Sequence, residues 1–317
     1  MRMDQIYVDI VLSVLQALLL LAIAPLVTGI IRKIKAYAQQ RRGASIFQPY
    51  WDIAKYFHKD SVVSRETSWI FSVTPYVSMA AVLIAALLVP VFVTRTLGFV
   101  GDLIVVVYLL GMVRFFTALA ALDAGSAFGG MGSSREMMVS SIVEPTMLLS
   151  IFAMGLITGT TSLGSIASAL SVSGIDLVRP ALFLASAAFF ISTVAENARV
   201  PVDNPTTHLE LTMIHEGMIL EYSGKKLGLM ELSSMFRLVL YFTILSNVFF
   251  PWGIANDLSA FSIGVGLVAI LVKVLFLALV IAIIESSISK LRLFRLPNLL
   301  TVSFTLALLA VMSFYIL

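Results

Sequence analysis

The sequence predicts an all-α integral membrane protein with about eight transmembrane helices and both termini on the non-cytoplasmic side. Of its 317 residues, 59% are hydrophobic and only 12% are charged, and the mean hydropathy is +1.00. A water-soluble domain with an ordinary polar surface does not reach these values. The apolar residues form continuous runs long enough to span a bilayer, rather than the alternating ten-residue pattern of barrel strands.

Eight apolar runs predict the spanning helices in chain order. They cover residues 6–31, 75–93, 103–122, 137–158, 180–194, 236–250, 261–284 and 296–317. A basic cluster at Arg32, Lys33 and Lys35 follows the first run, so we expect this helix to be retained rather than cleaved as a signal peptide. In the first loop, Pro49 can open an amphipathic helix at the membrane interface, which either anchors the loop or docks a partner.

The distribution of basic residues predicts the orientation. Most of the 21 Lys and Arg residues fall in loops on one side of the predicted spans, and such loops face the cytoplasm. The two long loops, about residues 32–74 and 198–235, both lie on that side. We therefore expect one transmembrane domain, residues 1–317, whose two long loops form a docking surface for a peripheral arm.

Composition also limits the chemistry. The net charge of +3 reflects a basic cytoplasmic face suited to anionic headgroups or an acidic partner protein, and since the charges anchor loops we expect no nucleic-acid binding. The absence of cysteine excludes disulfides and cysteine-ligated zinc or iron–sulfur sites within this chain. The glycine-rich segment at residues 125–136 lacks the pattern of a phosphate-binding loop and is expected to be a flexible turn that can approach a neighbour closely.

Ionisable side chains within or at the edge of the apolar runs are the first candidate site. Any one of them could be a helix–helix clamp, but such residues usually face a bundle interior or a water-filled cavity, and six together favour a proton or ion path. Glu144 precedes Pro145, and a carboxylate beside a proline kink is a plausible proton stop. The six are Arg114, Asp123, Glu144, Glu196, Lys273 and Glu285.

The polar passage after the fifth run is the second candidate. Glu196 and Arg199 are three residues apart and are expected to pair on one helix face. Pro201 and Pro205 should end that helix, and Thr206 or Thr207 can cap a new one. The His and Glu residues that follow favour proton handling or partner contact over a solvated face. A metal site is disfavoured because the pair His215–Glu216 lacks the second His of the HExxH motif.

These residues resemble the membrane protein known as the H subunit of respiratory complex I, and more closely the corresponding subunit of membrane-bound, energy-converting NiFe hydrogenases, including formate hydrogenlyase relatives. The resemblance runs from about residue 32 to 297. The hinge carries its specific part, Glu196, Arg199, Pro201, Asp203, Glu210–Leu211 and Glu221–Tyr222–Ser223–Gly224. The first loop adds Arg41–Arg42–Gly43, Gln48–Pro49, Asp52 and Lys55.

The resemblance implies a membrane anchor and coupling subunit of a ferredoxin-dependent, hydrogen-evolving oxidoreductase complex in the plasma membrane of a bacterium or archaeon. It implies partners: large and small hydrogenase subunits, iron–sulfur subunits of a peripheral arm, and antiporter-like membrane subunits. The NiFe centre and iron–sulfur clusters would lie on those partners, with no cofactor or catalytic residue in this chain. Glu144, Glu196 and Asp123 match the family's lateral acidic path. Residues implied for docking or coupling are Arg41, Arg42, Asp52, Lys55, Arg199, Asp203, His208, Glu210, His215, Glu216 and Glu221.

Departures from the complex I pattern favour the hydrogenase-like form. Val202 stands where that pattern has Phe, and Thr206 and His208 stand where it is more acidic. These changes fall where a quinone head-group would approach. The alternatives are the equivalent subunit of a sulfur-reducing or quinone-reducing relative, and a self-sufficient ion transporter.

Overall fold

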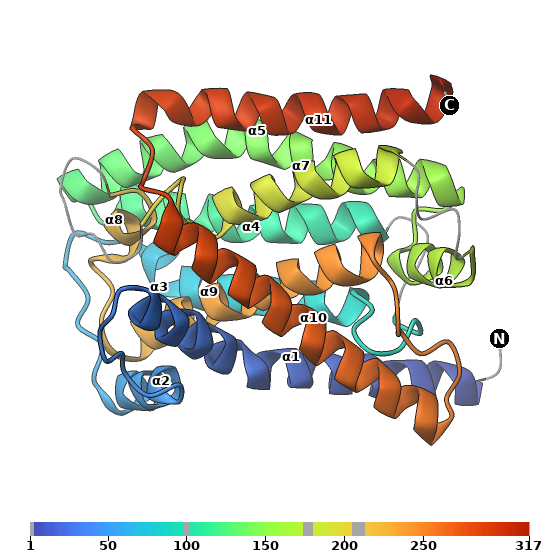
Figure 1. Ribbon diagram of the computed structural model, residues 1–317. Helices are drawn as coiled ribbons and strands as arrows, with labels where there is room; N and C mark the ends of the chain where they lie inside the picture. The colour runs from blue at the N-terminus through green and yellow to red at the C-terminus, as the bar shows by residue number, and fades with distance from the viewer. Residues whose placement is uncertain (1–2, 98–101, 174–179, 205–212, 317) are drawn as a thin grey trace.

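The computed structural model describes residues 3–97, 102–173, 180–204 and 213–316, and these form a helical bundle (Figure 1). Apart from an isolated bridge between Val93 and Ala255, the regular elements in these ranges are helical. In chain order they are α1 (Met3–Ala38), α2 (Gln48–His58), α3 (Trp69–Leu88), α4 (Asp102–Asp123), α5 (Ala127–Thr158), α6 (Leu163–Ser173), α7 (Pro180–Glu196), α8 (His215–Ile219), α9 (Gly224–Ile244), the π-helical turn η2 (Leu245–Phe249), α10 (Ala260–Ser287), the 3-10 turn η3 (Leu293–Arg295) and α11 (Leu296–Ile316).

Every predicted apolar run is helical over most of its length. Within the described ranges, seven helices are long and apolar enough to cross a membrane, and α7 is an apolar helix of 17 residues. The start of α1 and the end of α11 lie at the same end of the bundle (Figure 1). The predicted class, an all-α multi-pass membrane protein, is therefore confirmed, whereas the assignment of that end to the non-cytoplasmic side stays a prediction.

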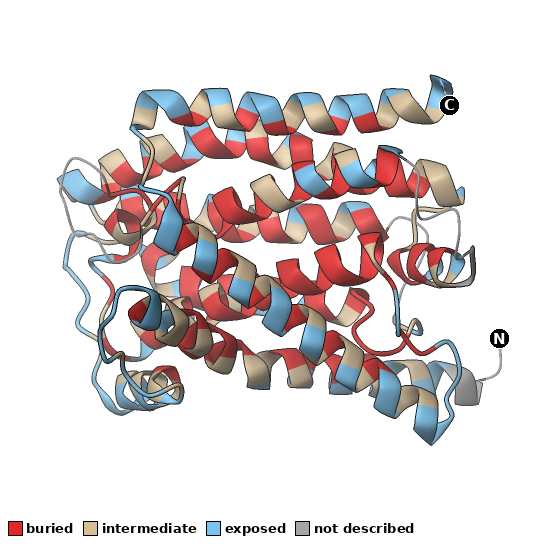
Figure 2. Cartoon of the chain, in the orientation of Figure 1, coloured by how far each residue is buried: buried red, intermediate tan, exposed pale blue. Residues whose placement is uncertain are grey.

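Helix α9 lies at the centre of the bundle. Its side chains are buried on all sides along its second half, including Phe236, Val239 and Phe242 (Figure 2). By contrast, α10 and α11 keep apolar side chains such as Phe276 and Tyr315 exposed. Apolar exposure of this kind suits lipid or a membrane partner, because hydrocarbon imposes no penalty on it.

The expected flexible turn at residues 125–136 is wrong, because α5 begins ten residues before the predicted span. Ser126 caps the helix by accepting a hydrogen bond from the Gly129 amide, which satisfies one free donor of the first turn. A side chain at Gly132 would place its Cβ 2.7 Å from the Ile214 carbonyl oxygen. Gly132 thus allows close packing against the segment that enters α8, as the sequence suggested, but from within a helix.

The two long loops are shorter than predicted. Helix α9 begins at Gly224 and so contains the last part of the loop expected at residues 198–235. In the first loop, α2 forms with Pro49 in its first turn, as predicted, and Trp51 remains 69% exposed on it.

Helix α6 lies between α5 and α7 in the chain, where no helix was expected.

Candidate functional site

Arg114 forms the centre of a buried group of charges that joins three helices. Its Nε lies 2.9 Å from Glu136 Oε1 of α5, and its Nη2 lies 2.7 Å from Glu196 Oε2 at the end of α7. The three side chains, which we call the charge cluster, are almost completely buried. Two carboxylates on one planar guanidinium is a geometry that lysine could not reproduce.

A polar row on α5 leads away from the charge cluster. Ser133, Glu136, Ser140 and Glu144 recur every three or four residues, so they share one helix face. The Ser140 hydroxyl donates a hydrogen bond to Glu144 Oε1 at 2.6 Å. Glu144 is half-buried, and no described residue forms an ion pair with it. The row places a second carboxylate two helical turns from Glu136.

The expected pairing of Glu196 with Arg199 is wrong. Helix α7 ends at Glu196, and Ala198 adopts a left-handed conformation with φ of 48°, which turns the following chain away from the helix face. Arg199 instead lies 3.3 Å from Glu285 Oε1 of α10, whose Oε2 lies 2.6 Å from Lys35 Nζ of α1. Glu285 therefore belongs to a separate ion group near the hinge and not to the charge cluster.

Asp203 fastens the hinge to two other segments. Its Oδ1 lies 2.5 Å from Lys290 Nζ, and its Oδ2 accepts the backbone N–H of His215 at 3.2 Å. The Leu291 amide donates to the Pro201 carbonyl at 2.9 Å. Buried carboxylates are tolerated where such partners satisfy them. The end of α10, the hinge and the start of α8 are thereby held together.

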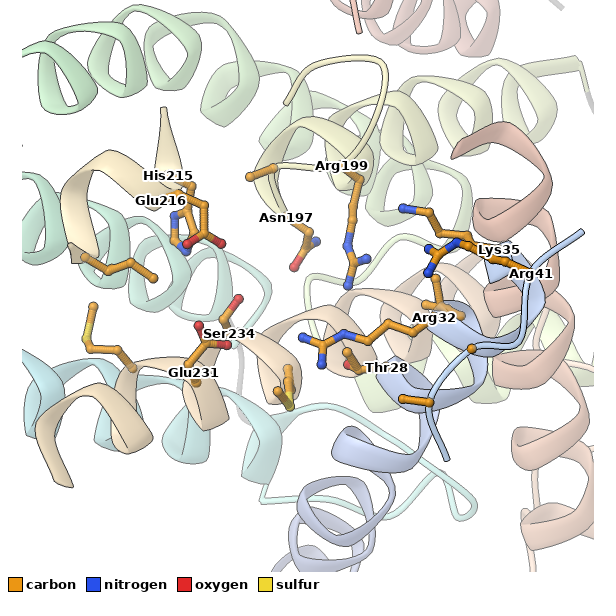
Figure 3. A pocket seen from close by; sticks show the side chains of 17 residues that line it. Thr28, Arg32, Lys35, Arg41, Asn197, Arg199, His215, Glu216, Glu231 and Ser234 are labelled. Carbon is orange, nitrogen blue, oxygen red and sulfur yellow. The ribbon is translucent and has the colours of Figure 1, made fainter. Parts of the chain in front are cut away.

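A cavity of about 300 Å³ lies beside this hinge, between α1, α8 and α9. Figure 3 shows its side chains divided by charge, with His215, Glu216 and Glu231 on one side and Arg32, Lys35, Arg41 and Arg199 on the other. Asn197, the residue after Glu196, also lines it, and its buried Oδ1 has no hydrogen-bond partner among the described residues. A polar cavity of this size has room for several water molecules.

Two neighbouring residues of α8 have shifted pKa values. Burial, followed by the positive charges of Arg237, Arg114 and Arg199, lowers the pKa of His215 to about 3, so this imidazole is neutral at physiological pH. Burial, followed by the negative charges of Glu231 and Asp203, raises the pKa of Glu216 to about 7. Glu216 can therefore gain or lose a proton near neutral pH. His215 lines the cavity, and the positive charge of Arg114 in the charge cluster contributes to the lowering of its pKa.

These shifts predict opposite effects of pH on stability. Folded Glu216 keeps its proton up to about pH 7 and the unfolded group only to about 4.5, so its contribution falls as pH rises through this window. Folded His215 stays neutral down to about pH 3, so its contribution falls as pH drops below about 6.5. We expect Glu216→Gln to remove the loss of stability with rising pH, and His215→Gln to remove the loss with falling pH. Melting temperatures of the purified complex from pH 5 to 8 measure both. Asp257→Asn, at an exposed position outside the docking residues, is the control. The prediction is contradicted if the melting temperatures of both variants depend on pH as those of the native complex do.

Asp123 and Lys273 lie apart from the charge cluster. Asp123 Oδ2 accepts the amides of Ser68 and Phe71 at 2.8 and 3.3 Å, at the start of α3. Lys273 Nζ donates to the Phe250 carbonyl at 2.7 Å and to Asn247 Oδ1 at 3.2 Å, where η2 ends the central helix. Both side chains satisfy backbone groups at helix ends, a role for which their charge signs are suited.

The predicted docking residues occupy the loop end of the bundle. Arg41, Arg42, Lys55 and Glu221 are exposed, and Asp52 accepts the side-chain amide of Gln48 at 2.9 Å and lies 3.8 Å from Arg32. His208 and Glu210, together with the predicted cap at Thr206 or Thr207, fall outside the described residues. Exposed residues of both signs leave this end available for contact with other subunits.

Sequence reasoning missed Glu136, Glu231 and Arg237. Glu136 ends the segment whose glycines predict a turn, and it joins the polar row with Glu144 only because α5 begins directly after Ser126. Arg237 stands at the edge of the predicted run 236–250 but is not among the six ionisable candidates, and it is buried on α9. Glu231 was hidden because residues 224–235 were assigned to a loop. In each case a misplaced helix boundary removed the signal.

The fold and site define a class: multi-pass membrane proteins in which a buried arginine–carboxylate cluster lies next to a polar cavity at the loop end. The chain belongs to the NADH dehydrogenase family, whose family model matches residues 10–316. It is thus a relative of the H subunit of complex I, and the resemblance seen in the hinge is confirmed.

Two named relatives match almost the whole chain, and a third matches about three quarters of it. Formate hydrogenlyase subunit 4 of Escherichia coli (strain K12) is 35% identical over 306 residues, covering 96% of this chain and 98% of that protein. Hydrogenase-4 component C of the same strain is 33% identical, covering 95% and 94%. The H subunit of NADH-quinone oxidoreductase from Rubrobacter xylanophilus is 29% identical, covering 73% and 71%. By name, these relatives are subunits of oxidoreductase complexes.

A solved structure shares the fold. It is described as the membrane-bound sulfane sulfur reductase, an archaeal respiratory membrane complex, and a chain of it superposes with a TM-score of 0.78 at 22% identity. The match covers 95% of this chain and 98% of that one. At this identity the likeness shows the fold alone.

Proposed function

We propose that this chain is the membrane anchor and coupling subunit of a ferredoxin-dependent, hydrogen-evolving NiFe hydrogenase complex in a prokaryotic plasma membrane. The two relatives with hydrogenase or hydrogenlyase names, each matched over more than nine-tenths of this chain, support this choice over the quinone-linked relatives. The NiFe centre and iron–sulfur clusters would be carried by partner subunits docked on the loops around α2 and α8, with antiporter-like subunits beside it in the bilayer.

The observation that carries the coupling role is the position of Arg114. It binds Glu136 and Glu196 inside the bundle, and the residue after Glu196 already lines the polar cavity at the loop end. Charge in this setting is costly, and ionisable residues within membrane spans commonly mark ion pathways and proton relays. We propose that protons or sodium ions move between this cavity and the charge cluster when partner subunits transfer electrons above it, with Glu216 and His215 between the two.

The neutral variant Glu196→Gln tests this role. Arg114 keeps Glu136 as a partner in this variant, so we expect the complex to assemble and to evolve hydrogen from a reduced donor in detergent. Ion uptake by vesicles should fall at least about tenfold, because a glutamine cannot change charge. Asp257→Asn, an exposed carboxylate outside the charge cluster and the docking residues, is the control. Native ion uptake by the Glu196→Gln vesicles would refute the coupling role.

The hydrogenase identity has its own test. Mass spectrometry of the complex purified through a tag on this chain should detect a NiFe large subunit and iron–sulfur subunits. Recovery of a sulfur-reducing or quinone-reducing catalytic subunit instead would overturn that part of the proposal and leave the coupling role standing.

A further inference from the structure

Gly111 of α4 faces the carboxyl group of Glu144. A Cβ atom built on Gly111 would lie 3.4 Å from Glu144 Oε1, 3.5 Å from its Cδ and 3.8 Å from its Oε2. Apart from the two chain neighbours of Gly111 and the nearby backbone of α4 itself, these are the three nearest atoms to that position, and all belong to one carboxyl group. The Glu144 carboxylate therefore lies against the α4 backbone, over the place where any other residue would begin its side chain.

The same face of α4 carries the charge cluster. Arg114 follows Gly111 by three residues, about one helical turn, and so lies on the same side of the helix. On α5, Ser140 lies midway between Glu136, which binds Arg114, and Glu144, to which Ser140 donates. The two helices thus place Glu144, Ser140, Glu136 and Arg114 in a row. Gly111 lies at the Glu144 end of this row, the end away from Arg114.

We infer that Gly111 is a positioning residue. Because it has no side chain, it leaves room for the Glu144 carboxylate between α4 and α5, within reach of the charge cluster. The inference rests on the proposed coupling role. A glycine that served helix packing alone would have the backbone or carbon atoms of α5 as its neighbours. Here the neighbour is a carboxyl group in a half-buried position that lacks an ion pair among the described residues.

Side-chain size at position 111 tests the inference in the assembled complex. In Gly111→Ala the Cβ makes ordinary van der Waals contact, and we expect ion uptake per electron within about twofold of native. In Gly111→Val the γ carbons take the place of the carboxyl group, and uptake per electron should fall about tenfold while hydrogen evolution in detergent is unchanged. Gly264→Val is the matched control, because Gly264 is a helical glycine of α10 with open space around it.

A double variant separates positioning from packing. If Gly111 acts through Glu144, then Gly111→Val combined with Glu144→Gln should take up no fewer ions than Glu144→Gln alone, since coupled sites are not additive. A purely structural glycine would instead lower the melting temperature of the complex in either background. Should the valine variant not assemble, Gly111→Ser decides: its hydroxyl can hold Glu144 in place, and uptake should fall at least about threefold.

The outcomes distinguish this inference from the proposed function. Full uptake in Glu144→Gln would remove Glu144 from the coupling path and overturn the inference with it. Loss of uptake in Glu144→Gln, but native uptake in an assembled Gly111→Val or Gly111→Ser complex, would overturn the role of Gly111 alone. A Gly111→Val complex that loses melting temperature and uptake together, while Gly111→Ser keeps native uptake, would show packing only.

Discussion

Replacement of Arg114 by leucine is expected to destabilise the membrane domain by about 3–5 kcal/mol, the usual cost of removing one partner from a buried ion pair. Glu136 and Glu196 would both lose their shared cation in the bundle interior. They would then either remain as unpaired buried charges or take up protons. The melting temperature of the purified complex, and the amount of this chain recovered in membranes, should both fall.

Three further variants identify the cause. Arg114→Lys keeps the charge but cannot hold both carboxylates, so its melting temperature should lie between native and Arg114→Leu. Arg95→Leu, at an exposed loop position, should change little. The triple variant with Arg114→Leu, Glu136→Gln and Glu196→Gln leaves no charge within the charge cluster and should recover stability without ion uptake. If Arg114→Leu melts like the native complex, the charge cluster does not stabilise the fold.

The helices could be predicted from the sequence because hydrocarbon admits few other structures. Backbone groups in a bilayer must bond within their own segment, so an apolar run of sufficient length is a helix whatever its neighbours. Boundaries outside the apolar runs were poorly predicted. The segment at residues 125–136 has the glycine content of a turn, but from Ala127 it is helical, and Gly132 packs closely against Ile214 near α8. That contact is a tertiary effect, which local composition does not carry.

The candidate site was predicted as a set of residues but not as a set of contacts. Arg114 and Glu196 were both selected because charge is rare in apolar runs, yet their pairing depends on how α4 and α7 pack. Glu285 was selected on the same grounds and lies elsewhere, with Lys35 and Arg199. Glu196 and Glu144, expected to act alike, differ in the structure. One is held by a guanidinium, and the other has only a serine hydroxyl among its described polar partners.

The second large effect is expected at Gly224, where the two long loops meet. Gly224 has φ of 52°, and a Cβ on it would lie 2.3 Å from the backbone oxygen of Asp60. Beside it, Ser223 Oγ accepts the Val62 amide at 2.8 Å and donates to the Val62 carbonyl at 2.9 Å. The first loop therefore packs directly on the start of α9, in the region proposed to carry the peripheral arm.

Gly224→Ala is expected to cost about 1–3 kcal/mol for the left-handed backbone alone, and more because the clash is with backbone that cannot rotate away. The clash should push the first loop away from the start of α9. We therefore expect the complex to lose its peripheral subunits before the bundle itself unfolds. Gel filtration would then show the peripheral subunits eluting separately from the membrane subunits. Gly130→Ala is the matched control, as Gly130 lies within α5 with nothing within 4 Å of its Cβ position. A Gly224→Ala complex that keeps its peripheral subunits and its melting temperature would mean that the first loop moves aside without cost, and that docking does not depend on this contact.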